Sequence, residues 1–146
     1  MIYVLYGQPG SGKTTLAGLL AKQLNDDAYI IDGDRLRRLT RNYDFTRSGR
    51  ENNIRKANKM VANLHSHSNV IMALVNPYKQ LREELAAANP GQVIEVLLTS
   101  KRTLRKEYHV EDFDVGTPDI CLNTDRDELS TLESLITMID NYMMYP

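Results

Sequence analysis

One stretch near the start of the chain indicates the fold, because a short apolar run there leads into a glycine-rich turn. The turn reads Gly7-Gln8-Pro9-Gly10-Ser11-Gly12-Lys13-Thr14. It matches the pattern G-x-x-x-x-G-K-[ST] in full, with a predicted strand before it and a helix-period segment after it. In this pattern the backbone N–H groups and the N-terminus of the helix bind phosphate. The stretch therefore predicts a nucleoside triphosphate site, with ATP as the expected ligand.

Each part of this phosphate loop has an expected role. The glycines let backbone N–H groups converge on the β-phosphate. Lys13 is expected to reach the β- and γ-phosphates, and the Thr14 hydroxyl is expected to ligate Mg²⁺. We expect ATP to contact the whole stretch from Gly7 to Thr15.

The remainder of the chain alternates between apolar runs and segments of helical period. Residues 2–6, 28–31, 70–75, 93–98 and 120–122 are predicted strands. Helical patterns follow at 16–24, 54–64 and 129–143. Ser48–Glu51 and Thr124–Asp127 resemble helix-starting sequences for the second and third of these helices. The alternation predicts a three-layer α/β/α sandwich around a five-stranded parallel sheet, as a single domain over residues 1–146.

Composition narrows the class of protein. The chain has 146 residues, a net charge of −1 and one cysteine, which excludes a disulfide framework and a multi-cysteine zinc site. No apolar stretch has the length of a membrane span, so we expect a cytoplasmic protein without membrane contact. Charge is segregated, however: residues 35–59 carry +7 and residues 111–146 carry −8. The positive segment is mostly arginine, which suits phosphate and sulfate groups.

Two carboxylates follow the second predicted strand. Asp32 and Asp34 are expected beside the phosphate loop, because ligands of open α/β sheets lie at the carboxyl ends of the strands. The third strand, where a Walker-B aspartate is expected, is instead followed by Asn76. A carboxylate in this place holds a magnesium-bound water, the role we expect for Asp32, or accepts the proton of an attacking hydroxyl. Either role predicts a kinase, with Lys13, Asp32 and Asp34 as catalytic residues, whereas the alternative is a strand-ending turn.

Four ordered motifs in the first three fifths of the chain resemble those of the adenylylsulfate kinase family. They are the phosphate loop, Asp32-Gly-Asp34-Arg-Leu-Arg37, Phe45-Thr-Arg-Ser-Gly-Arg50-Glu-Asn-Asn53-Ile-Arg55-Lys56, and Asn76-Pro77-Tyr78-Lys-Gln-Leu-Arg82. The resemblance implies transfer of the γ-phosphate of MgATP to the ribose 3′-hydroxyl of adenosine 5′-phosphosulfate. It implies that the acceptor is bound by Asp34, Arg37, Phe45, Arg50, Asn53, Pro77 and Tyr78. The residue chemistry agrees, since Arg37 and Arg50 suit an anionic acceptor and Phe45 suits stacking on a base.

The last two fifths of the chain depart from the family pattern. The family lid, which closes over both nucleotides, is replaced by a shorter segment over residues 99–119. Arg102 or Arg105 is the candidate for the missing adenine-contacting arginine, with Arg105 taken as an ATP-binding residue, and Phe113 is the candidate for the lid aromatic. A shortened lid leaves the acceptor pocket more open.

An open basic pocket leaves two alternatives to a small anionic nucleotide acceptor. One is a kinase acting on a hydroxyl of a polynucleotide or of a modified DNA base, and the other is a nucleotide-binding regulatory module without catalysis. The apolar end of the chain, residues 141–146, is expected to pack on the sheet or on a second subunit, which leaves a homodimer open.

Overall fold

The computed structural model describes residues 1–25 and 27–145, and its centre is a parallel five-stranded sheet. The strand order is β2-β3-β1-β4-β5, and every neighbouring pair is parallel. The strands are β1 (Ile2–Tyr6), β2 (Ala28–Asp32), β3 (Asn69–Ala73), β4 (Val93–Thr99) and β5 (Ile120–Asn123). All five predicted strands are confirmed: β1 has the predicted ends, and the ends of the other four differ from the prediction by at most two residues.

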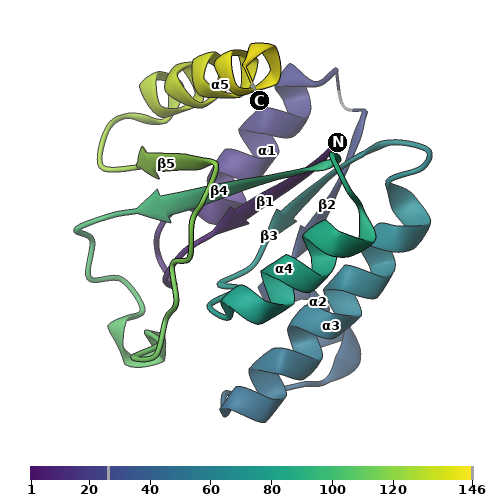
Figure 1. Ribbon diagram of the computed structural model, residues 1–146. Helices are drawn as coiled ribbons and strands as arrows, with labels where there is room; N and C mark the ends of the chain where they lie inside the picture. Colours follow the sequence, from purple (N-terminus) through teal and green to yellow (C-terminus); the bar gives the residue numbers. More distant parts are fainter. Residues whose placement is uncertain (26, 146) are drawn as a thin grey trace.

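Helices cover both faces of the sheet (Figure 1). Helices α1 and α5 share one apolar cluster with the sheet, and α2, α3 and α4 share the other on the opposite face. The helices are α1 (Lys13–Gln23), α2 (Gly33–Thr40), α3 (Arg47–Leu64), α4 (Lys79–Ala88) and α5 (Glu128–Met144). The predicted three-layer α/β/α arrangement is confirmed.

The central strand shows why these short runs become strands. All five residues of β1 are buried, because β1 lies between β3 and β4 with helices on both faces. Val4 and Tyr6 face the cluster of α3 and α4, whereas Tyr3 and Leu5 face the cluster of α1 and α5. A strand buried on both faces requires a continuous apolar sequence. The carboxyl end of β1 leads directly into the phosphate loop.

Both predicted helix starts were placed incorrectly. Helix α3 is capped by the Thr46 hydroxyl, which accepts a hydrogen bond from an N–H of the first turn, and not by Ser48, which lies inside the helix. Helix α5 is capped by Asp127, whose carboxylate accepts from the Ser130 N–H at 2.9 Å. Thr124 is three residues too early because its hydroxyl is used elsewhere, in a contact with the phosphate loop. The sequence offered several cap residues in each case, and for α5 the long-range contact of Thr124 leaves Asp127 as the cap.

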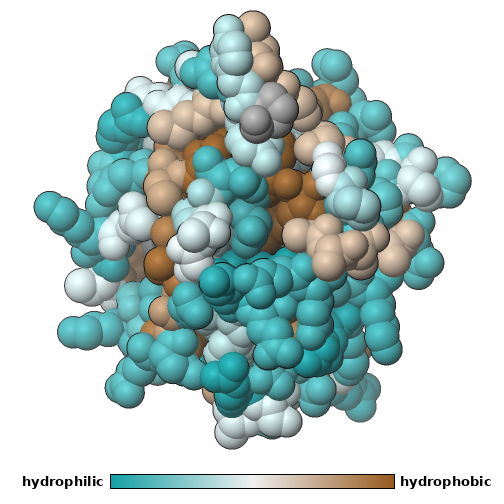
Figure 2. All heavy atoms as spheres, viewed as in Figure 1, coloured by the Kyte–Doolittle hydropathy of each residue, from teal (hydrophilic) through white to brown (hydrophobic). Residues whose placement is uncertain are grey.

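The surface is polar over α3 and α4 and more apolar between α4 and α5 (Figure 2). At the C-terminal end, Tyr142 packs against the apolar cluster that α1 and α5 share with the sheet, in agreement with one of our two expectations for residues 141–146, whereas Met144 and Tyr145 are 68% and 78% exposed. Pro146 lies outside the described residues. Among residues 1–25 and 27–145, no helix has the length and apolar character needed to cross a membrane.

Candidate functional site

The phosphate loop has the backbone that its glycines permit. Gly10 and Gly12 adopt φ angles of 84° and 93°, in the left-handed region that other residues rarely enter. Gly12 then caps helix α1, so that the helix N-terminus points toward the loop. This geometry directs the free N–H groups of the first helical turn and the positive end of the helix dipole at one point, where a phosphate group binds.

Lys13 is the one cation of the phosphate loop, and it is buried, with 8% of the residue exposed. Its Nζ donates to the carbonyl oxygens of Gly7 at 3.0 Å and Gln8 at 2.9 Å, and to the Ser11 hydroxyl at 3.3 Å. Burial lowers the pKa of Lys13 to about 8, and the nearby Asp34 carboxylate partly offsets this effect. The ammonium group is thus held against neutral oxygen atoms, at a place where a phosphate would bind it more strongly.

Two side-chain oxygen atoms, from Thr14 and Asp32, meet beside the phosphate loop. The Thr14 hydroxyl donates to Asp32 Oδ1 at 2.7 Å. The other carboxylate oxygen of Asp32 accepts the N–H of Arg35 at 3.0 Å and thereby caps helix α2, which begins directly after β2. Asp32 therefore ends a strand, as we expected if the segment were only a turn. It also lies next to Thr14, as we expected if Asp32 held a magnesium-bound water.

A cavity of about 400 Å³ lies above the carboxyl ends of the strands. It brings together residues from the phosphate loop, from helices α2 and α3 and from the segment after β4. The predicted site residues that line it are Pro9, Gly10, Gly12, Lys13, Thr14, Thr15, Asp32, Asp34, Arg37, Phe45, Arg50, Asn53, Pro77 and Arg105. Gly7, Gln8, Ser11 and Tyr78 are predicted site residues that do not line it.

The reasons for these four differ. Gly7, Gln8 and Ser11 belong to the phosphate loop, but their oxygen atoms accept hydrogen bonds from Lys13. Tyr78 is 3% exposed and belongs to the apolar core, with the Arg47 guanidinium 4.3 Å from its ring centre. We therefore assign Tyr78 to the core and not to the acceptor site.

One half of the cavity is cationic and aromatic. The guanidinium of Arg37 lies 4.3 Å from the centre of the Phe45 ring and donates to the Asp44 carbonyl at 3.0 Å. Burial, followed by the charge of nearby Arg50, lowers the pKa of Arg37. Asn53 completes this half with a buried Oδ1 that has no hydrogen-bond partner in the described part of the chain. Two neighbouring arginines and an unpartnered amide oxygen indicate a site for an anionic, hydrogen-bonding group.

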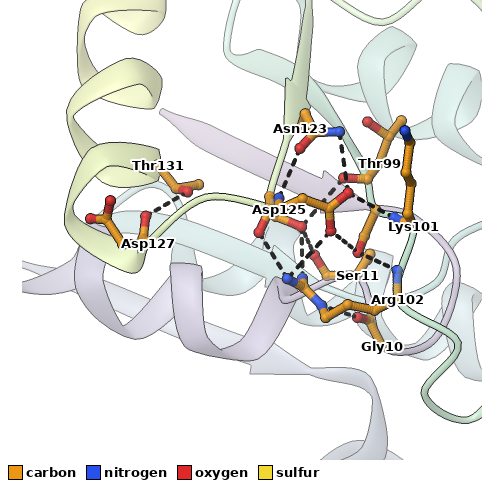
Figure 3. A network of polar contacts seen from close by, with 11 residues as sticks. Gly10, Ser11, Thr99, Lys101, Arg102, Asn123, Asp125, Asp127 and Thr131 are labelled. Carbon is orange, nitrogen blue, oxygen red and sulfur yellow. Dashed lines mark hydrogen bonds and ion pairs between the residues drawn. The ribbon is translucent and has the colours of Figure 1, made fainter.

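The other half lies toward β5 and α5 (Figure 3). Here Arg102 donates to the Thr124 carbonyl and hydroxyl, both at 2.8 Å, and to the Gly10 carbonyl at 3.3 Å. The Thr124 hydroxyl in turn donates to the Ser11 carbonyl at 2.6 Å. Arg102 and Thr124 thus connect the end of β5 to the phosphate loop.

The segment between β4 and β5, residues 100–119, is called the lid below. Its Tyr108 ring lies 5.1 Å from the Phe45 ring, whereas Phe113, the aromatic expected there, stacks on Tyr6 at the edge of the core. The guanidinium of Arg105 forms an ion pair with Asp34 at 2.7 Å. Of the two candidates for an adenine-contacting arginine, Arg102 therefore lies toward β5, whereas Arg105 lies beside Asp34. Our expectation for the lid aromatic was wrong because the sequence does not show which lid residues turn inward.

Sequence reasoning also missed several cavity residues. Asn76 was noted as the replacement for a Walker-B aspartate and as part of the fourth motif but was given no role, yet it is 2% exposed, and its side-chain amide has no hydrogen-bond partner in the part of the chain that the structure describes. Its position at the end of β3 was the available signal. The other missed residues include Leu104, Tyr108, Thr124, Arg126, Glu128 and Thr131, which all follow β4, whereas Arg102 was one of our two candidates for an adenine-contacting arginine.

The family assignment follows from comparison with known proteins. A sequence profile described as adenylylsulphate kinase matches residues 1–112. The chain belongs to the adenylylsulphate kinase family. No curated protein sequence matches it. Membership makes this chain a P-loop kinase, that is, a nucleotide-binding phosphotransferase that acts on a hydroxyl group.

Solved structures share the fold of this adenylylsulphate kinase family member at low sequence identity. The APS kinase of Mycobacterium tuberculosis, solved in complex with AMPPNP and APS, has a TM-score of 0.81 at 20% identity, covering 95% of this chain and 96% of that one. Shikimate kinase from Aquifex aeolicus has a TM-score of 0.70 at 14% identity, covering 100% of both chains. A gluconokinase from Sinorhizobium meliloti has a TM-score of 0.70 at 14% identity, covering 95% of this chain and 91% of that one.

Proposed function

We propose that this kinase transfers the γ-phosphoryl group of MgATP to the ribose 3′-hydroxyl of adenosine 5′-phosphosulfate. The observation that carries the proposal is the cationic and aromatic half of the cavity. Arg37 and Arg50 suit the phosphate and sulfate groups of such an acceptor, because guanidinium groups bind both oxyanions with paired hydrogen bonds. Phe45, 38% exposed, offers a ring for stacking on a base, and Asn53 offers a free amide oxygen.

The residues beside the phosphate loop suit Mg²⁺. Thr14 and Asp32 supply two oxygen atoms that are already 2.7 Å apart, and magnesium prefers one or two protein oxygens together with substrate phosphates and water. Within the described residues, no group of three or more histidine, cysteine or acidic side chains gathers that holds a metal by itself. We propose that Thr14 ligates the metal and that Asp32 holds one of its waters. Bound there, Mg²⁺ neutralises charge on the β- and γ-phosphates.

In the proposed reaction Asp34 accepts a proton from the acceptor hydroxyl. That oxygen forms a bond to the γ-phosphorus, the bond from phosphorus to the bridging oxygen breaks, and its electron pair leaves with ADP. Lys13 holds the phosphates in place during the transfer. Asp34 and Lys13 both line the cavity, which supports these roles.

A transfer assay tests the acceptor. We would offer γ-labelled ATP with adenosine 5′-phosphosulfate, with nucleoside monophosphates, and with single-stranded and duplex DNA at two salt concentrations. We expect label on adenosine 5′-phosphosulfate, and we expect Arg50→Ala to lower kcat/KM for it at least about tenfold, as loss of a charge-assisted hydrogen bond does. The matched control is Arg55→Ala on the same helix, because Arg55 pairs with Glu84 at 3.0 Å and does not line the cavity.

Other outcomes would contradict the proposal. Transfer to DNA alone, with a steep loss at higher salt, would indicate a polynucleotide kinase. Transfer to a nucleoside monophosphate alone would keep the small anionic acceptor but remove the sulfate. If ATP binds and no acceptor is labelled, the chain is a regulatory nucleotide-binding module.

A further inference from the structure

The lid supplies a cation, Arg105, to the lining of the cavity. Arg105 Nη1 donates to Asp34 Oδ2 at 2.7 Å, and the two side chains are 46% and 49% exposed. The remaining N–H groups of this guanidinium have no partner in the described part of the chain, so most of its five donors are available. Arg105 also adopts a φ of 55°, a left-handed backbone that non-glycine residues rarely take.

The lid backbone lies directly on the phosphate loop. A Cβ atom added to Gly10 would come within 2.6 Å of the Leu104 carbonyl oxygen, so this glycine is needed for the close approach of the lid. Further along, the Gln8 side chain and the Val110 backbone exchange two hydrogen bonds of 2.8 Å. Arg105 lies between these two contacts in the sequence. Its guanidinium also adds a cationic contribution that lowers the pKa of Lys13, in agreement with a position near the loop.

We propose that Arg105 is a catalytic residue that leaves Asp34 and binds the γ-phosphoryl group when ATP occupies the cavity. This inference deepens the proposed function and depends on it for the role of Asp34. In the structure the Asp34 carboxylate accepts a hydrogen bond from Arg105, much as backbone oxygens accept hydrogen bonds from Lys13. A γ-phosphate carries more charge and more acceptor oxygens than one carboxylate, and the guanidinium fork matches its geometry.

The exchange would have two consequences for the transfer step. The guanidinium would stabilise the negative charge on the γ-phosphoryl oxygens while the bond to the acceptor oxygen forms and the bond to the bridging oxygen breaks. Asp34 would lose its ion-pair partner and become free to accept the proton of the acceptor hydroxyl. ATP binding and activation of Asp34 would then be one event.

The test compares the affinities of ATP and ADP, measured calorimetrically in the presence of MgCl₂. ADP lacks the γ-phosphoryl group, so Arg105→Ala should weaken ATP binding at least tenfold and ADP binding less than threefold. Lys106→Ala is the matched control: it removes the neighbouring lid cation, which is exposed and does not line the cavity, and both affinities should stay within twofold. Thermal unfolding of each variant establishes that the fold is retained.

A second pair of variants separates direct phosphate binding from simple charge neutralisation. Without Arg105, the uncovered Asp34 carboxylate would itself repel ATP. We would therefore compare Asp34→Asn with the double variant Asp34→Asn/Arg105→Ala. The tenfold loss specific to ATP should persist between these two proteins, because the repelling carboxylate is absent from both.

Three results would overturn the proposal. Equal losses of ATP and ADP affinity would make Arg105 an adenine or ribose contact, and unchanged affinities for both would reduce the ion pair with Asp34 to a surface contact. Disappearance of the ATP-specific loss in the Asp34→Asn background would mean that Arg105 only neutralises Asp34. No acceptor is needed for these measurements, so a wrong acceptor assignment would leave their outcome unaffected.

Discussion

The phosphate loop, residues 7–14, and the lid, residues 100–119, lie against each other but are stabilised by different kinds of contact. The hydrogen bonds that Lys13 makes in the loop are local in sequence, because Lys13 donates to the carbonyls of Gly7 and Gln8, which precede it by six and five residues. The lid contains one 3-10 turn of three residues and otherwise depends on distant partners. The Tyr6 hydroxyl donates to the carbonyl of the lid residue Val115, which is 109 positions away in the sequence. The Arg82 guanidinium donates to the carbonyl of the lid residue Asp114, which is 32 positions away.

This difference shows how a kinase site can combine a part that its own residues stabilise with a part that distant residues stabilise. The loop conformation follows from its own residues, so substitutions there should act on the chemistry and leave the fold intact. The lid conformation depends on the assembled sheet, so substitutions there should have smaller and separable effects. The predictions below test this contrast, from the largest expected effect to the smallest.

Lys13→Ala should abolish phosphoryl transfer. The variant removes the one cation buried inside the loop, which holds the β- and γ-phosphates in the proposed reaction. Because Lys13 is held by oxygen atoms of the loop alone, the thermal unfolding temperature should stay close to that of the unmodified protein. Turnover near the wild-type level in a coupled assay would show that the loop is not the active phosphate site.

Asp34→Asn should lower kcat by about 10²–10⁴-fold, the usual contribution of general-base assistance. The substitution keeps the size of the side chain, so the lid contact is weakened without a steric change. The comparison is made at equal folded fraction, judged by circular dichroism. A loss below about tenfold would identify Asp34 as a residue of the helix start and remove it from the mechanism.

The pH dependence of ATP binding should report on Lys13. Its pKa is lowered to about 8 by burial, so the free protein loses this positive charge as pH rises through 8. ATP binds the protonated form, so its affinity is fully present below pH 8 and should fall about tenfold between pH 7 and pH 9. Calorimetric titrations at several pH values measure this slope. A flat profile would mean that the ammonium group stays charged throughout this range.

Gln8→Ala should loosen the lid and leave α1, the helix that follows the phosphate loop, unchanged. The variant removes both hydrogen bonds between Gln8 and Val110, each worth about 0.5–1.5 kcal/mol. Amide hydrogen exchange at Val110 should accelerate at least about fivefold, while exchange within α1 should be unaffected. Equal acceleration in both places would contradict the separation between a local loop and a lid that depends on distant contacts.

Sequence patterns were sufficient for the sheet and the loop because both are encoded by short-range regularities. Each strand is an apolar run, and of the two loop glycines with positive φ, Gly10 and Gly12, the motif itself requires Gly12. Helix starts were less predictable, because Thr46 and Ser48 are both good caps and only one of them has a free N–H within reach. The Asp32-Gly-Asp34 segment was expected to form a turn or a site, and it also begins a helix.

The sequence by itself determined the phosphate loop, the parallel sheet and the arginine-rich character of residues 35–59, because these depend on residue type and spacing within a few positions. Only the tertiary structure decided that Arg105 meets Asp34, that Arg102 meets Thr124, and that Tyr108 lies beside Phe45. The lid has no apolar periodicity that fixes which side chains point inward. Its conformation is set by hydrogen bonds to residues many positions away, and such contacts exist only after the strands and helices have packed.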